Sequence, residues 1–223
     1  MDDLRLAYQH IIAYLEQRLE DDPIYGWIAE ETERRGLPTI QVTPVQGRLL
    51  NLLAQLLNAR YVLEIGTLGG YSGVWLARAV PPGGKLFTLE IDPTCAEVAR
   101  ESFSRAGVAD RIELHLGPAL ETLATLELPE LLDLVFIDAD KDAMRSYFDW
   151  ALEHVRSGGL IIVDNVPIVH ADVVESDDVR VHTQAVYQLY EYVVARRSNW
   201  GTLLPFYRPN GDLMDGMLIY RQP

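Results

Sequence analysis

The sequence predicts an α/β protein with a doubly wound, mostly parallel seven-stranded sheet that is preceded by N-terminal helices. Short apolar runs alternate with helical segments five times, which is typical of such sheets. Two further β-type runs follow near the end, joined by the turn residues Pro209–Asp212. A chain of 223 residues suits one domain. We therefore expect a single domain over 1–223, with N-terminal helices in 1–58 and the α/β core in 59–223.

The first 58 residues are predicted to form three helices. Apolar side chains spaced by three and four make Leu4–Leu19 an amphipathic helix, whose apolar stripe we expect to face a partner subunit. A second helix is expected over Pro23–Arg35, stopped by Gly36. Thr43 before Pro44 has the pattern of an N-cap, which predicts a third helix that reaches about Asn58.

The stretch Tyr61–Asp92 has the pattern strand, glycine turn, helix, strand. Its strands are predicted over Tyr61–Ile65 and Lys85–Ile91, and its turn over Gly66–Gly70. Such a unit forms two parallel strands with a right-handed crossover. The glycines allow the start of the helix to approach a ligand closely.

The rest of the chain continues this alternation and ends in an antiparallel pair of strands. Residues 167–178 lack periodicity, and we expect a functional loop there. The predicted elements are a helix over Pro93–Ala106, a strand over Arg111–Leu116, a helix opened by Gly117, a strand over Leu132–Ile137, a helix to about Val155, a turn at Ser157–Gly159, a strand over Leu160–Val163, a helix over Val179–Arg197, and strands over Leu203–Arg208 and Leu213–Arg221.

Polar residues stand where the predicted parallel strands end. In doubly wound sheets, ligands bind beyond the carboxyl ends of the strands. The residues expected to face this one crevice are Glu64, Glu90, Asp138, Asp164 and Asn165.

The glycine turn favours S-adenosylmethionine over a nicotinamide cofactor. The dinucleotide pattern is G-x-G-x-x-G, whereas this turn has a carboxylate and two glycines, Glu64, Gly66 and Gly70. A negative Glu64 repels a pyrophosphate but suits an ammonium and a sulfonium. Glu90 follows the turn at the spacing of a ribose-binding carboxylate. The alternative interpretation is a glycine turn that only joins a core strand to a core helix.

Asp138, Asp164 and Asn165 offer two carboxylates and an amide oxygen from neighbouring strand ends. Such hard oxygen ligands suit Mg²⁺ first, or Mn²⁺ or Ca²⁺, rather than zinc. Each residue alone could instead be an ordinary turn former. Lys141 is a candidate general base beside a metal-held hydroxyl, or else a solvated surface lysine.

Composition narrows the partners and the compartment. The formal net charge of −14 argues against a nucleic-acid partner. No apolar run is long enough to suggest a membrane span, and the N-terminus does not resemble a secretory signal. Cys95 is the single cysteine, and we expect it to be a buried structural thiol. These features favour a cytoplasmic protein.

Five ordered motifs resemble those of a known family. The segments VLEIGTLGGYS, LEID, GPA, FIDADK and GGLIIVDNV are similar to the cation-dependent class I O-methyltransferases, which include the caffeoyl-CoA and catechol O-methyltransferases and their bacterial relatives. The resemblance extends from about Val42 to Tyr220. It implies a Rossmann-like methyltransferase fold, S-adenosylmethionine as cofactor, a divalent cation and a homodimer formed through the N-terminal helices.

The resemblance also implies roles for individual residues. Lys141 matches the catalytic lysine, which removes a proton from a hydroxyl of a vicinal dihydroxy substrate held by the metal. Asp138 is expected to act in catalysis, in cofactor binding and, with Asp164 and Asn165, as a metal ligand. The other implied cofactor contacts are Glu64, Gly66, Tyr71 and Ser72 for the methionine part, Glu90 for the ribose, Ala119 for the adenine and Val42 as a wall.

Plant relatives often have an asparagine at the position of Val169, which makes a CoA ester a less expected substrate. We therefore expect a small catechol-like aromatic as the methyl acceptor. The alternatives are a nicotinamide-dependent oxidoreductase and a cofactor-binding protein without catalysis.

Overall fold

The computed structural model describes residues 22–166, 188–193, 195, 201–207 and 214–223, together with His10, Ile11, Tyr14 and Arg18. Its strands are β1 (Tyr61–Ile65), β2 (Lys85–Glu90), β3 (Ile112–Leu116), β4 (Leu132–Ile137), β5 (Val155–Val163), β6 (Gly201–Tyr207) and β7 (Met214–Arg221). Its helices are α2 (Pro23–Arg34), α3 (Pro44–Leu56), α4 (Tyr71–Ala79), α5 (Pro93–Arg105), α6 (Ala119–Thr125) and α7 (Met144–His154), with a 3₁₀ turn η1 (Ala109–Arg111).

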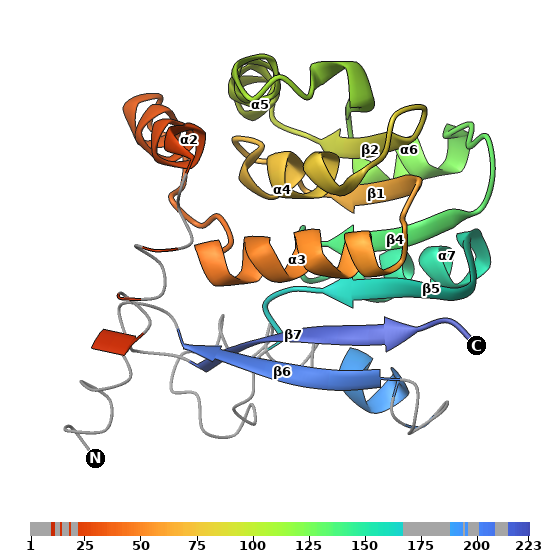
Figure 1. Cartoon of the computed structure of the whole chain (residues 1–223). Helices are drawn as coiled ribbons and strands as arrows, with labels where there is room; N and C mark the ends of the chain where they lie inside the picture. The colour runs from red at the N-terminus through yellow and green to blue at the C-terminus, as the bar shows by residue number, and fades with distance from the viewer. Residues whose placement is uncertain are drawn as a thin grey trace.

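The seven strands form one sheet in the order β3-β2-β1-β4-β5-β7-β6 (Figure 1). The first five strands along the chain pair in parallel, and β7 pairs antiparallel with both β5 and β6. This arrangement confirms the predicted fold class. The chain moves outward from β1 to β3 and then returns to place β4 on the other side of β1, so the switch point of the topology lies between β1 and β4. Ligands bind at such points in doubly wound sheets.

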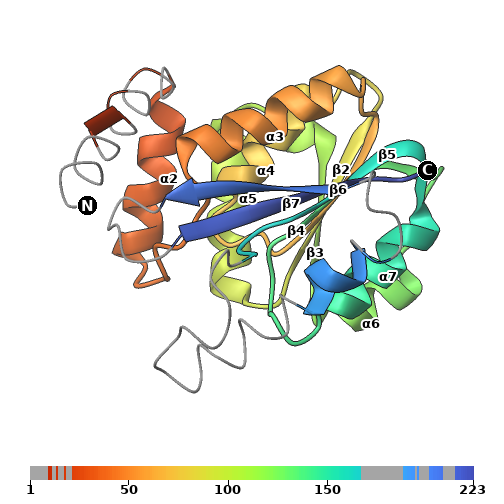
Figure 2. The ribbon, with the colours of Figure 1, turned by 90° about the horizontal axis from the view of Figure 1, so that it is seen from below.

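Helices cover both faces of the sheet, as Figure 2 shows from below. One apolar cluster joins α2, α3, α4 and α5 to one face, and a second joins α6 and α7 to the other. β4 is buried along its whole length because both clusters cover it. Its continuous apolar sequence follows from this position.

The strand β5 begins earlier than predicted. The turn predicted at Ser157–Gly159 is wrong, because these residues belong to β5, which starts at Val155 directly after α7. Gly158 has a φ of +80°, and the register with β4 shifts between Leu132 and Leu134. The N–H of Gly158 donates to the carbonyl of Gln222, so the bulged segment is held by the C-terminal end of the chain.

Several predicted segments fall wholly or partly outside the described residues. The four described residues before Asp22 are helical, as are 188–193 and 195, whereas the rest of the predicted helices Leu4–Leu19 and Val179–Arg197 lies outside. The predicted loop 167–178, with Val169, also lies outside. Within the described part of the chain, no helix is long and apolar enough to cross a membrane.

Candidate active site

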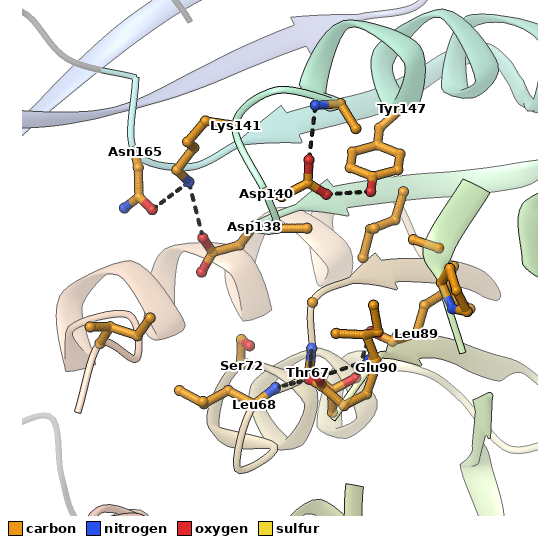
Figure 3. A pocket seen from close by; sticks show the side chains of 18 of the residues that line it. Thr67, Leu68, Ser72, Leu89, Glu90, Asp138, Asp140, Lys141, Tyr147 and Asn165 are labelled. Atoms are coloured by element: carbon orange, nitrogen blue, oxygen red, sulfur yellow. Dashed lines mark hydrogen bonds and ion pairs between the residues drawn. The ribbon is translucent and has the colours of Figure 1, made fainter. Parts of the chain in front are cut away.

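A cavity of about 790 Å³ opens beside the switch point, at the carboxyl ends of the parallel strands (Figure 3). Glu64 and Asp164 are absent from its lining because they are almost fully buried, with 0% and 2% of their surface exposed. The other predicted site residues all line the cavity: Val42, Gly66, Tyr71, Ser72, Glu90, Ala119, Asp138, Lys141 and Asn165.

The glycine turn begins in close contact with the backbone that follows β4. Gly66 has a φ of +97°, and a side chain there would collide with the carbonyl oxygen of Asp138. Gly70, the residue before α4, has a φ of +85°. Both residues adopt backbone conformations that glycine tolerates best. The first turn of α4, with Tyr71 and Ser72, therefore faces the cavity.

Glu90 holds this turn in place through both of its carboxylate oxygens. Its Oε2 accepts the backbone N–H groups of Thr67 at 3.2 Å and Leu68 at 2.7 Å. Its Oε1 accepts those of Ile91 at 2.8 Å and Asp92 at 2.9 Å. Glu90 thus has a structural function that its spacing from the glycines did not indicate, in addition to its place in the cavity lining.

Glu64 is a fully buried carboxylate with one unused oxygen. Its Oε2 accepts the hydroxyl of Thr88 at 2.6 Å, while Oε1 has no hydrogen-bond partner among the described residues. Burial raises the pKa of Glu64 to about 7, against the hydrogen bonds from Ser72 and Thr88, and the negative charge of Asp138 adds to the rise. A positively charged ligand in the cavity would favour the ionised form of this side chain.

Asp138, Lys141 and Asn165 form the other side of the cavity. The ammonium group of Lys141 donates to Asn165 Oδ1 at 2.7 Å and lies 3.8 Å from Asp138 Oδ1. Figure 3 shows the three side chains converging. Asn165 has a φ of +57°, a left-handed conformation that asparagine tolerates better than most residues. Two of the three predicted metal ligands therefore already share one cationic partner.

Asp164 precedes Asn165 in the sequence and is buried next to the cavity lining. Its Oδ2 accepts the amide N–H of Asn165 at 3.3 Å, and its backbone N–H continues the ladder to Ile137. Among the described residues, no group of three or more His, Cys, Asp and Glu side chains is placed to hold a metal. The predicted set has two carboxylates and an amide, and its hard oxygen atoms fit Mg²⁺ chemistry.

The prediction missed two further side chains of the site. Gln46 donates from Nε2 to Asp164 Oδ1 at 3.1 Å, and the Thr-x-x-Gln capping pattern at the start of α3 could have indicated its position. The hydroxyl of Tyr147 donates to Asp140 Oδ2 at 2.6 Å at the cavity wall. Burial, followed by the hydrogen bond to Asp140, raises the pKa of Tyr147.

Comparisons with known proteins agree with this geometry. The family model described as O-methyltransferase matches residues 16–198. The chain is 49% identical over 167 residues to a catechol O-methyltransferase of Mycobacterium tuberculosis, covering 74% of this chain and 76% of the relative. It is 45% identical over 149 residues to a catechol O-methyltransferase of Niastella koreensis, covering 66% and 67% of the two chains.

Solved structures show the same similarity over almost the full length. An O-methyltransferase of Streptomyces achromogenes involved in tomaymycin synthesis, solved in complex with S-adenosylmethionine, has a TM-score of 0.85 and 36% sequence identity, covering 96% of each chain. The family model, the shared fold and the sequence identity to known O-methyltransferases agree with one another. This chain belongs to the O-methyltransferase family.

Proposed function

We propose that this enzyme transfers a methyl group from S-adenosylmethionine to a hydroxyl of a small, catechol-like aromatic with vicinal hydroxyls. We further propose that the reaction depends on a divalent cation, with Mg²⁺ as the first candidate and Mn²⁺ or Ca²⁺ as alternatives. The observation that carries the proposal is the convergence of Asp138, Lys141 and Asn165 at the edge of the cavity that the glycine turn lines.

The other side of the cavity supports the cofactor part of the proposal. Oε1 of Glu64 is a buried acceptor without a hydrogen-bond partner in the described part of the chain, and a positively charged methyl donor would stabilise its negative charge. The relative from Streptomyces achromogenes, which shares the fold, was solved with S-adenosylmethionine. The residues proposed to contact the cofactor are Glu64, Gly66, Tyr71 and Ser72 at the methionine part, Glu90 at the ribose, Ala119 at the adenine, and Val42 and Asp138 as neighbouring walls.

The donor set supports the cation. Asp138, Asp164 and Asn165 bring two carboxylates and an amide oxygen to the ends of β4 and β5. The Lys141 ammonium group lies 2.7 Å from Asn165 Oδ1 and 3.8 Å from Asp138 Oδ1, which supports a site that accommodates positive charge. We propose these three oxygen-bearing side chains as the metal ligands.

The names of the relatives support the substrate class. Two relatives at 45% and 49% identity are catechol O-methyltransferases. A catechol presents two adjacent oxygens, which suits a site with hard cation ligands and a nearby ammonium group. The cavity of about 790 Å³ is of the size that holds a cofactor and a small ring together.

In this proposal Lys141 reacts as the neutral amine, and its Nζ accepts the proton of the reacting hydroxyl and so becomes the ammonium group. Nζ lies at the cavity edge, where the hydrogen bond to Asn165 and the nearby Asp138 carboxylate orient it. When bound, the cation would lower the pKa of the substrate hydroxyl, and the cofactor would supply the methyl group. The protein's own contribution is to orient the reactants, exclude water and remove the proton.

The alternatives are separated by one experiment. Membership of the O-methyltransferase family argues against a nicotinamide-dependent oxidoreductase. Methyl transfer from labelled S-adenosylmethionine to caffeic acid and related catechols should be measured with added Mg²⁺ and again with EDTA. Turnover that EDTA abolishes supports cation-dependent methyl transfer to a catechol. Turnover that survives EDTA rejects the cation, and cofactor binding without turnover on any catechol favours the non-catalytic alternative.

We also propose that the enzyme is a cytoplasmic homodimer formed through its N-terminal helices. Ile11 and Tyr14 belong to the predicted amphipathic helix, and 56% and 54% of their surfaces are exposed in the single chain. Large apolar side chains on one helix often mark a protein interface. A second copy of the chain is the partner we propose for them.

A further inference from the structure

Gln46 connects the start of α3 to the end of β5 through both ends of its amide. Its Oε1 accepts the backbone N–H and the hydroxyl of Thr43, each at 2.9 Å. Its Nε2 donates to Asp164 Oδ1 at 3.1 Å, across 118 positions of sequence. Gln46 is 4% exposed, so bulk water has little access to these contacts. One amide therefore holds the N-cap of α3 and a proposed metal ligand together.

An amide of this length is needed for both contacts. The N-cap requires an acceptor, and the carboxylate of Asp164 requires a donor. A glutamate could serve the N-cap, as in the usual capping box, but it would place a second carboxylate against Asp164. An asparagine would be one methylene too short to keep both distances. Capping of α3 alone would accept a glutamate at this position, whereas the additional contact with Asp164 requires a glutamine.

The helix that carries Gln46 is itself fixed against α4. A side chain on Gly47 would collide with the indole ring of Trp75, so α3 approaches α4 closely at this point. Asn51 donates from Nδ2 to the carbonyl of Trp75 at 2.8 Å. These contacts restrain the backbone at Gln46, so its amide cannot shift together with the Asp164 carboxylate. The amide therefore restrains the orientation of that carboxylate.

Asp164 is held on its two sides by amides. Gln46 contacts Oδ1, and Asn165 donates to Oδ2 at 3.3 Å. The residue before the N-cap, Val42, lines the cavity where the cofactor is proposed to lie. A substitution of Gln46 therefore removes a direct contact with Asp164 on the cation side of the cavity. On the cofactor side, it acts through the N-cap of α3, which follows Val42.

We propose that Gln46 is a positioning residue that sets the orientation of the Asp164 carboxylate for a divalent cation. Outer partners of this kind direct the carboxylates that bind metals and tune their affinity. The inference rests on the proposed function, because it assumes that Asp164 binds a cation. It extends that function by naming the side chain that prepares this ligand.

The test is a titration of the full-length protein with Mn²⁺ in the absence of substrate. Electron paramagnetic resonance measures the bound Mn²⁺. Gln46→Met keeps the length and the buried character of the side chain but removes its three hydrogen bonds, two from Thr43 and one to Asp164. We expect Mn²⁺ affinity to fall about 10- to 100-fold, with S-adenosylmethionine affinity by calorimetry within about threefold of the wild type. Gln55→Met is the control, since Gln55 lies on the same helix and its side chain donates to Asn51, away from Asp164.

A second variant guards against a folding defect. Gln46→Asn keeps the amide in its buried position but shortens its reach, and we expect an intermediate loss of Mn²⁺ affinity, at least about threefold. Folded Gln46 variants that bind Mn²⁺ as the wild type does would overturn the role of Gln46 and leave the proposed function standing. A wild-type protein that binds no Mn²⁺ would overturn the cation and the role of Gln46 together.

Discussion

Lys141 and Asn165 meet at the edge of the cavity, with Nζ 2.7 Å from Oδ1, although 24 positions separate them in the sequence. Lys141 follows β4 and Asn165 follows β5. The two strands are neighbours in the sheet, and Ile137 pairs with Val163 at their carboxyl ends. The contact therefore results from strand register. It brings a proposed general base beside a proposed metal ligand.

Replacement of Lys141 by alanine is expected to lower turnover about 100- to 10,000-fold, because a positioned proton acceptor contributes that much to catalysis. The affinity for S-adenosylmethionine should stay within about threefold, as measured by calorimetry. Lys85→Ala is the control, since Lys85 bonds to the carbonyl of Asp110, away from the cavity. A large loss of cofactor binding in Lys141→Ala would show that its role is misassigned.

Replacement of Asp164 by asparagine is expected to weaken the binding of Mg²⁺ at least about tenfold, because a buried carboxylate is lost from the proposed ligand set. The activity should then recover in part at high Mg²⁺ concentration. Titration of the initial rate with Mg²⁺ measures this effect, and Asp110→Asn is an exposed control. Equal Mg²⁺ dependence in the two variants would contradict the assignment of Asp164.

Glu64 is expected to make the stability of the free protein depend on pH. Burial raises its pKa from 4.5 to about 7, so the folded state binds more protons than the unfolded chain between these values. The stability contributed by this group is full below pH 4.5 and is lost as the pH rises through about 7. Glu64→Gln should flatten this part of the profile, as measured by urea unfolding at a series of pH values.

The same residue should link cofactor affinity to pH in the opposite direction. A cationic cofactor favours ionised Glu64, so its affinity should rise as the pH approaches and passes about 7. Calorimetry in buffers of different ionisation enthalpy would detect the released proton. No proton release in the wild type, or the same release in Glu64→Gln, would exclude Glu64 as its source.

Gly66→Ala is expected to lower the free energy of unfolding by about 2 to 4 kcal/mol, because the φ of +97° disfavours alanine and the new methyl collides with Asp138. Thermal unfolding measures the change. Gly26→Ala is the control: Gly26 lies in α2, where nothing lies within 4 Å of an added Cβ. That variant should gain about 0.5 to 1 kcal/mol from reduced backbone entropy in the unfolded chain. Equal effects at both positions would contradict the proposed tight turn.

Ile11→Asp is expected to convert the proposed dimer to a monomer, because it places a charge in the predicted apolar stripe of the N-terminal helix, at a residue that is 56% exposed. Light scattering measures the mass of each form. Leu131→Asp, at an exposed position just before β4, should leave the dimer intact. A monomeric wild-type protein would reject the dimer altogether.

Most of the described elements could be predicted because their signals are local. Pro23, Pro44 and Pro93 each begin a helix, with Asp22, Thr43 and Asp92 as the preceding N-caps. The start of β5 was not predictable in this way. Ser157–Gly159 has the composition of a turn, but the C-terminal Gln222 pairs with the bulged backbone and keeps it extended. A distant partner thus overrides the local preference.

The sequence by itself determined the order of strands and helices, the glycine turn and the polar residues at the strand ends, because periodicity, capping and glycine placement act over a few neighbouring residues. Only the tertiary structure decided which side chains are buried and which atoms meet. Glu64 loses its solvent because helices and neighbouring strands enclose β1, and that enclosure raises its pKa. Gln46 reaches Asp164, which follows β5, because α3 packs closely against α4. Contacts between such distant residues depend on packing and register, which no local pattern specifies.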